Sequence, residues 1–122
     1  MASATAQEVG RYVEAFHGPR QEKVWILRLG AKEKREALVQ IWGVDHELDG
    51  RILKTRIQQG ERPRYEIKVD GAPFNLLLRT SLTCLDLWLP GETESIPLCY
   101  DRQLSESGHP QRFLENYEKQ GR

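Results

Sequence analysis

The strongest constraint on the fold is a series of short apolar runs, separated by turn residues, that extends from Lys23 to Tyr100. The runs are five to seven residues long and rich in Val, Ile and Leu, which is typical of β-strands. Gly60, segment 70–73 and the pair 90–91 supply residues that favour tight turns between them. The predicted strands are 24–29, 37–42, 52–57, 65–69, 74–78, 83–89 and 95–100.

The second of these strands has an alternative interpretation. Residues 32–41 contain strong helix formers, so a short helix would also fit there. However, apolar Val39 and Ile41 flank polar Gln40, and Gly43 follows closely. This alternation favours a strand.

Three consecutive hairpins support an antiparallel sheet, because each can be aligned with apolar residues opposite one another. Residues that oppose each other across a strand pair share one face of the sheet, and a slip of one residue would turn all of them to the other face. The predicted pairs are Ile57 with Tyr65; Val69 with Phe74, Ile67 with Leu76 and Tyr65 with Leu78; and Leu87 with Ile96 and Leu85 with Leu98.

Helical patterns flank the strands on both sides. Near the N-terminus, Thr5 and Glu8 have the spacing of a capping box, and Gly18 followed by Pro19 would end the helix. Residues 110–120 begin with a proline, which suits the first helical position. The apolar stripes are Val9, Tyr12, Val13 and Phe16 in the first helix and Phe113, Leu114 and Tyr117 in the second.

These elements predict an α+β fold in a single domain, residues 1–122. We expect a curved antiparallel β-meander of about six or seven strands, with an N-terminal and a C-terminal helix packed on it. A half-open barrel is an alternative, since a twisted sheet with that many strands tends to curl.

Composition limits the classes of function. The 122 residues include 18 basic and 18 acidic side chains, and a net charge of zero argues against DNA or RNA as the main partner. No apolar run is long enough to span a membrane, and residues 1–5 lack the start of a signal peptide. We therefore expect a cytoplasmic protein in which Cys84 and Cys99 are reduced thiols. The hairpin register sets these two cysteines opposite each other, so a cross-strand disulfide is the alternative.

The densest group of potential metal ligands is the acidic turn 45–50, Asp-His-Glu-Leu-Asp-Gly. Its spacing is similar to the start of an EF-hand calcium loop, but Arg56 occupies the position that requires a bidentate Glu. A looser metal site formed by Asp45, His46 and Asp49 is a minor alternative. The sequence contains no nucleophile motif and no phosphate-binding glycine loop. It therefore predicts no metal and no cofactor, and it favours a protein that is not an enzyme.

Charge and tryptophan gather on the face of the predicted sheet that is opposite the core. With Tyr65 and Val69 pointing inward, the alternate residues of the same strands are mostly basic, and Leu77 and two tryptophans are expected to point the same way. Residues 51–81 hold seven basic and three acidic side chains, whereas residues 82–106 hold one basic and five acidic ones.

Three interpretations of this outer face compete. A solvated polar face is the simplest one. A surface for a protein partner is the second, because Trp and Arg are frequent in interface hot spots and complementary charge speeds association. Single-stranded nucleic acid is the third and the weakest, given the zero net charge.

The functional prediction is a non-catalytic protein-binding module, such as an inhibitor, an immunity-type protein or an adaptor. The alternative is a small-molecule-binding half-barrel or a small enzyme that uses Asp45, His46 and Asp49, and a homodimer is also compatible with the sequence. The predicted partner-binding residues are Trp42, Lys54, Arg56, Arg64, Lys68, Arg79 and Trp88, with Asp45, Glu47 and Asp49 as a second, acidic patch.

Overall fold

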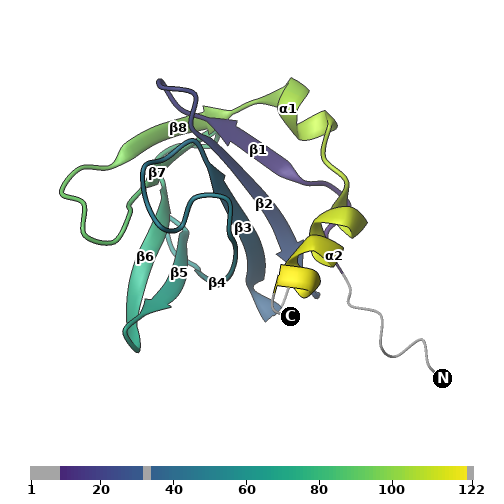
Figure 1. The fold of residues 1–122 in the computed structure, drawn as a ribbon, viewed down its shortest axis with the longest axis horizontal. Helices are drawn as coiled ribbons and strands as arrows, with labels where there is room; N and C mark the ends of the chain where they lie inside the picture. Colours follow the sequence, from purple (N-terminus) through teal and green to yellow (C-terminus); the bar gives the residue numbers. More distant parts are fainter. Residues whose placement is uncertain (1–8, 32–33, 121–122) are drawn as a thin grey trace.

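The computed structural model describes residues 9–31 and 34–120, and its strands close into a β-barrel (Figure 1). Eight antiparallel strands follow one another around the barrel in chain order, and the last strand pairs with the first. Two helices follow the barrel, α1 (Arg102–Glu106) and α2 (Pro110–Gln120). The strands are β1 (Glu14–His17), β2 (Lys23–Leu29), β3 (Glu36–Trp42), β4 (Ile52–Gln58), β5 (Arg64–Val69), β6 (Ala72–Arg79), β7 (Cys84–Leu87) and β8 (Ile96–Tyr100).

Alternate side chains of the strands point inward and fill the barrel. An eight-stranded barrel has an interior just wide enough to be filled by side chains. Val24 and Ile26 of β2 and Val39 and Ile41 of β3 belong to this interior cluster and are buried. Other buried members are Phe16, Ala37, Tyr65, Leu76, Leu77, Leu85, Leu87, Leu89 and Leu98.

Figure 1 shows α2 against the outside of the barrel, and a second apolar cluster lies between this helix and the strands. Phe113 and Leu114 of the helix pack with outward-facing residues such as Leu27 and Leu38. The side chain of Gln120, at the end of the helix, accepts a hydrogen bond from the backbone N of Ile52 at 2.8 Å. Among the described residues, neither helix is long and apolar enough to cross a membrane.

The short helix α1 holds β1 in place, and the sequence patterns did not predict it. The carboxylate of Asp101 caps the helix by accepting a hydrogen bond from Leu104 N at 3.0 Å. This backbone hydrogen bond, assisted by His17, lowers the pKa of Asp101 below its ordinary 3.8. Inside the helix, the buried hydroxyl of Ser105 accepts a hydrogen bond from Ala15 N of β1 at 2.8 Å.

The predicted N-terminal helix is wrong for the described residues. Residues 14–17 form β1, which pairs with β2 and β8, and Val9 forms an isolated bridge with Leu29. The helix-like spacing has another cause: Phe16 faces the barrel interior, whereas Val13 belongs to the second cluster. Thr5 and Glu8, the predicted capping box, lie outside the described residues.

The predicted α+β meander is therefore corrected to a closed, mostly β barrel with a short C-terminal helix. All seven predicted strands are present, and the second helix occupies Pro110–Gln120 as expected. The eighth strand, β1, supplies the missing partner that turns the open meander into a barrel.

Two of the three predicted hairpin registers are confirmed. Ile57 pairs with Tyr65 in β4–β5. In β7–β8, Leu87 pairs with Ile96 and Leu85 with Leu98.

The predicted β5–β6 register is wrong for two reasons. First, Asp70 and Gly71 form a two-residue turn, with φ of 53° and 81°, that pairs Val69 with Ala72; Asp-Gly favours such a turn because both positions need positive φ. Second, Glu66 pairs with Asn75 but Tyr65 pairs with Leu77, so Leu76 is an extra, bulged residue.

The bulge changes which residues of β6 face inward. Leu77, expected on the outer face, is fully buried in the interior cluster. Arg79, two residues further, pairs with Leu85 and lines the same hollow as Tyr65. Arg79 therefore belongs to an end of the barrel and not to its outer face.

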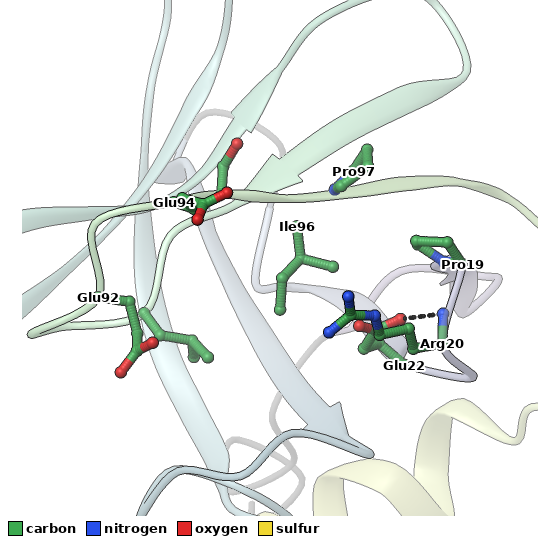
Figure 2. Close-up of a pocket in the computed structure, with 9 residues that line it drawn as sticks. Pro19, Arg20, Glu22, Glu92, Glu94, Ile96 and Pro97 are labelled. Carbon is green, nitrogen blue, oxygen red and sulfur yellow. Dashed lines mark hydrogen bonds between the residues drawn. The ribbon is translucent and has the colours of Figure 1, made fainter.

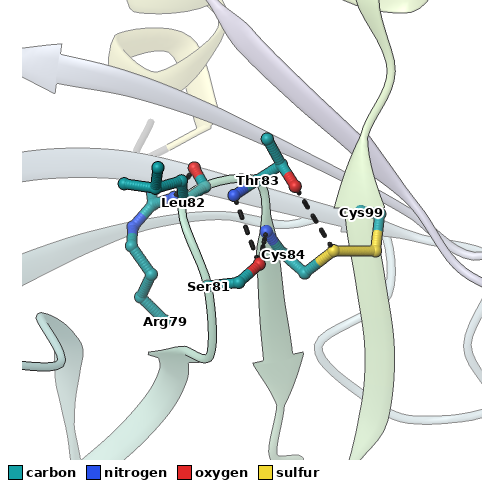
Figure 3. The surroundings of a disulfide bond; sticks show 6 residues. All are labelled: Arg79, Ser81, Leu82, Thr83, Cys84 and Cys99. Carbon is teal, nitrogen blue, oxygen red and sulfur yellow. Dashed lines mark hydrogen bonds between the residues drawn. A yellow bond between two sulfur atoms is a disulfide. The ribbon is translucent and has the colours of Figure 1, made fainter.

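Cys84 and Cys99 form a disulfide across β7 and β8, with an S–S distance of 2.09 Å (Figure 3). The expected reduced thiols are thus replaced by the alternative. Figure 3 shows the turn beside the bond, where the hydroxyl of Ser81 accepts hydrogen bonds from the backbone N of Thr83 and Cys84 at 3.3 and 3.1 Å.

We expect Phe113→Ala to lower the free energy of unfolding by about 3–5 kcal/mol, because it leaves a cavity in the cluster under α2. Glu115→Ala, at an exposed position of the same helix, should change it by less than about 0.5 kcal/mol. Urea denaturation measures both values. Equal small effects would show that α2 contributes little to the stability of the barrel.

We expect loss of the disulfide to cost about 3 kcal/mol, since the two cysteines are 15 residues apart in sequence and the bond restricts that loop in the unfolded chain. Denaturation of the Cys84→Ala/Cys99→Ala variant measures this cost. The wild type in a reducing buffer should unfold at the same midpoint as the variant in that buffer. If the reducing buffer does not move the wild type towards the variant, the bond is not formed in solution.

Candidate functional site

The two ends of the barrel differ in how they are closed. One end carries the turns after β1, β3, β5 and β7, and it is covered by the β3–β4 loop, residues 43–51. Val44 and Leu48 of this loop pack against the interior cluster. Apolar side chains therefore close this end, and we call it the closed end.

The acidic turn of the sequence lies in this loop and has a structural role there. His46 Nδ1 accepts a hydrogen bond from Leu48 N at 3.1 Å, and Nε2 lies 2.9 Å from the carbonyl O of Pro90. Asp49 Oδ1 accepts a hydrogen bond from Val44 N at 3.1 Å. Two of the three proposed ligands thus hold the loop itself, and the described residues contain no group of three side chains placed to bind a metal.

At the opposite end, which we call the open mouth, the inward-facing positions change from apolar to polar. Val24 and Ile26 of β2 face the interior, and Arg28 follows at the same two-residue spacing. Tyr65 of β5 and Arg79 of β6 occupy corresponding inward positions. The open mouth is lined by Glu14, Arg28, Arg35, Tyr65, Arg79 and Tyr100.

Three shallow hollows open at this mouth, with volumes of about 250, 230 and 680 Å³. Glu14 lines all three. Arg28 and Arg79 both line the first, whose floor is apolar and includes Ile26 and Ile57. The three hollows therefore lie next to one another around Glu14.

The arginines at the mouth are not neutralised by described carboxylates. Within residues 9–31 and 34–120, the ion pairs join His17 to Asp101, Lys54 to Glu36 and Arg102 to Glu106. In the same part of the chain, the buried Nε of Arg28 has no hydrogen-bond partner. Burying a hydrogen-bond donor without a partner lowers the stability of the folded protein by about 1–3 kcal/mol. An acceptor at Arg28 Nε would remove this cost.

Tyr65 adds a neutral donor to the same hollow. Burial raises the pKa of its hydroxyl above the ordinary 10.0; the adjacent Arg79 guanidinium opposes this shift, and Glu14 adds to it. The hydroxyl therefore keeps its proton near neutral pH and is free to donate to an anion.

Exposed apolar side chains gather around the open mouth. Among the described residues, the large exposed ones are Leu82 (94% exposed), Tyr12 (75%), Trp42 (45%) and Tyr100 (42%). Tyr12 and Tyr100 line the largest hollow, and Leu82 and Tyr100 line the smallest. Three of the four therefore surround the arginine-lined region, which is how a binding surface differs from scattered exposed residues.

The residues predicted to bind a partner do not form one surface. Trp42 ends β3 and Trp88 follows β7. Three strands lie between β3 and β7 in either direction around the barrel, so the two tryptophans lie on opposite sides of it. Trp42 is exposed and Trp88 is half-buried. The exposed basic residues of β4 and β5 are Lys54, Arg56, Arg64 and Lys68, and the acidic patch at the closed end is Asp45, Glu47 and Asp49. In an open meander these residues would share the outer face of the sheet. Closure into a barrel distributes them around its circumference.

Sequence reasoning found one residue of the open mouth, Arg79, but placed it on the wrong face. It missed Arg28, although the two-residue period of Val24 and Ile26 already predicts an inward arginine there. For Tyr100 the indication was weaker: as the last residue of a predicted strand, it was expected at an end of the sheet. Tyr12 was assigned to a helix that is absent from the described residues 9–17.

A second concave region, an acidic groove, lies at the closed end between the β1–β2 turn and the β7–β8 loop (Figure 2). Its volume is about 370 Å³, and Glu22, Glu92 and Glu94 line it with Arg20. Glu22 is buried and accepts a hydrogen bond from Arg20 N at 2.8 Å, shown as a dashed line in Figure 2. Glu22 therefore closes its own turn, and only Glu92 and Glu94 remain as exposed acids.

Comparison with models of protein families, with curated proteins and with solved structures finds no match for this chain. Its function is therefore inferred from the chemistry of its own surface.

We expect His46→Ala to lower the free energy of unfolding by about 1–3 kcal/mol, because the partly buried hydrogen-bond partners of the imidazole would be left unsatisfied. Asp45→Ala, two residues after Gly43 and exposed, should change it by less than about 0.5 kcal/mol. Thermal denaturation with and without added Zn²⁺ or Ca²⁺ checks both values. Stabilisation by a metal that is lost in both variants would restore the metal-site interpretation.

Proposed function

We propose that this protein is a non-catalytic protein-binding module and that it contacts its partner with the open mouth of the barrel. The observation that carries the proposal is the grouping of Tyr12, Leu82 and Tyr100 around an arginine-lined concave region. Tyr and Arg are enriched in interface hot spots, which cluster where apolar anchors are surrounded by polar groups. Leu82, which is 94% exposed, is better suited to contact with a partner's surface than to binding a small ligand.

The filled interior of the barrel argues against the alternative of a small-molecule-binding half-barrel. Phe16, Leu77 and Leu98 are fully buried inside it, and the concave regions described above open at the surface. The enzyme alternative relied on Asp45, His46 and Asp49, and the last two are engaged in hydrogen bonds within their own loop.

The charge at the mouth suggests the character of the partner. Arg11, Arg28, Arg35 and Arg79 line its hollows, and Glu14 is the acidic residue among the lining residues of all three. A partner with an acidic surface would be steered towards this excess of positive charge and would bind with a strong dependence on salt.

The disulfide bears on where this binding takes place. The sequence favoured the cytoplasm, but disulfides persist mainly in oxidising compartments such as the periplasm or the cell exterior. The Cys84–Cys99 bond supports the second location, and we include an oxidising compartment in the proposal.

Two double variants test the proposed interface. Tyr12→Ser/Leu82→Ser changes two exposed residues at the open mouth, and Arg64→Glu/Lys68→Glu changes the exposed basic face predicted from the sequence. A partner is first captured from native lysate, then purified and titrated by calorimetry. We expect the mouth variant to bind at least about 30-fold more weakly, the effect of losing one hot spot, and the outer-face variant to bind nearly as the wild type does.

Tyr100 is left unchanged in this test because its ring contacts Phe16, with centroids 5.8 Å apart, and its loss would disturb the core. Both variants should melt within a few degrees of the wild type, since they alter exposed side chains. Weakened binding of the outer-face variant with unchanged binding of the mouth variant would contradict the proposal. Unchanged binding of both would contradict it as well.

A further inference from the structure

At the centre of the open mouth, three hydrogen-bond donors from distant parts of the chain line one hollow. Arg28 comes from β2, Tyr65 from β5 and Arg79 from β6, and all three line the hollow of about 250 Å³. Its floor is formed by apolar residues of the interior cluster, including Ile26 and Ala37. Charged and neutral donors above an apolar floor are the arrangement expected of a site for an anion that loses part of its water shell.

The donors have capacity that the described part of the chain does not use. Nε of Arg28 is buried without a hydrogen-bond partner. One guanidinium nitrogen of Arg79, Nη1, donates to the carbonyl O of Leu82 at 3.0 Å, and the guanidinium also hydrogen-bonds the Tyr65 hydroxyl. Because a guanidinium has five N–H groups, Arg79 keeps donors for a further acceptor. An unsatisfied buried donor in a folded protein calls for a reason, and a ligand oxygen is one such reason.

No carboxylate among the described residues fills that role. Glu14 lines the hollow, but its side chain is exposed, and it forms no ion pair with Arg28 or Arg79 in the described part of the chain. The site therefore keeps a positive charge in the described structure. An external anion would neutralise it.

We infer that Arg28, Tyr65 and Arg79 form a subsite for a carboxylate of the protein partner, either an acidic side chain or a chain terminus. This inference rests on the proposed function, because it assigns the carboxylate to the protein bound at the mouth. Forked guanidinium groups match the planar, two-oxygen geometry of a carboxylate, and the Tyr65 hydroxyl supplies a third donor. The surrounding Tyr12, Leu82 and Tyr100 would then cover the apolar parts of the partner next to its acid group.

The first experiment needs no partner and no variant. Two-dimensional NMR of the ¹⁵N-labelled wild type follows the arginine Nε–H resonances during titration with small probes. N-acetylglycine presents a terminal carboxylate, N-acetylglutamic acid α-amide presents a side-chain carboxylate, and N-acetylglycinamide is the neutral control. We expect one or both acids to shift the Arg28 Nε–H resonance in a saturable manner and the neutral amide to leave it unchanged.

The two acids distinguish the two sources of the carboxylate. Tighter binding of N-acetylglycine assigns the subsite to a chain terminus, and tighter binding of the glutamate derivative assigns it to a side chain. Inorganic phosphate is titrated in parallel. A saturable response to phosphate with none to either acid would overturn the carboxylate assignment, and so would no response to any anion or an equal response to the neutral amide.

Two variants locate the site. Arg79→Gln removes the charge at the subsite, and Arg56→Gln removes one from the exposed outer face of β4. We expect Arg79→Gln to weaken binding of the acid at least about tenfold, the effect of losing a charge-assisted hydrogen bond, and Arg56→Gln to leave it unchanged. Equal effects of the two variants would show that the acid responds only to overall charge.

This experiment separates the failure of the subsite from the failure of the proposed function. If acid binding is saturable but the Tyr12→Ser/Leu82→Ser variant binds the partner with unchanged affinity, the subsite is supported and the proposed interface is overturned. A partner that binds the mouth, together with a wild-type protein that binds no acid, would leave the interface in place and overturn the subsite.

Discussion

Closure of the barrel by β1 is the constraint on which the rest of the structure depends. This strand of four residues pairs with β2 on one side and with β8 on the other, where Phe16 opposes Tyr100 and His17 opposes Cys99. Closure removes both free edges of the sheet and gives Phe16 an interior to fill. From outside, α1 holds the strand through hydrogen bonds between Ser105 and the backbone of Ala15. The sheet edges, the interior and the open mouth therefore all depend on one short segment.

The two ends of the closed barrel satisfy their polar groups in opposite ways. At the closed end, His46 and Asp49 direct their hydrogen bonds back to the loop backbone and to Pro90, so the acidic turn is part of the structure that covers the interior. At the open mouth, the buried Nε of Arg28 is left without a described partner. Buried polar groups without hydrogen-bond partners often occur at functional sites. Here the unsatisfied donor lies beside exposed aromatic and aliphatic side chains.

The parts of the fold that were predicted correctly depend on residues close together in the sequence. The seven strands from β2 to β8 follow from short apolar runs and turn residues, and α2 follows from its apolar stripe. The registers of β4–β5 and β7–β8 follow from apolar residues that fall opposite one another when neighbouring runs are aligned. The predicted β5–β6 register was wrong because Asp70 and Gly71 form a shorter turn than expected, and because the bulge at Leu76 adds a residue without changing the apolar pattern. The prediction for β1 was wrong because this segment contributes residues to both apolar clusters, and the spacing of those residues resembles that of a helix.

The sequence by itself determined the strand segments, the positions of most turns and the C-terminal helix, because these depend on local conformational preference and on the period of the apolar residues. Only the tertiary structure decided that the sheet closes, that Arg79 turns inward and that Trp42 and Trp88 lie on opposite sides. The candidate site belongs to this second group. Its lining residues come from separate strands and share no motif, so only the pairing of β1 with β8, more than 80 residues away, brings them around one opening.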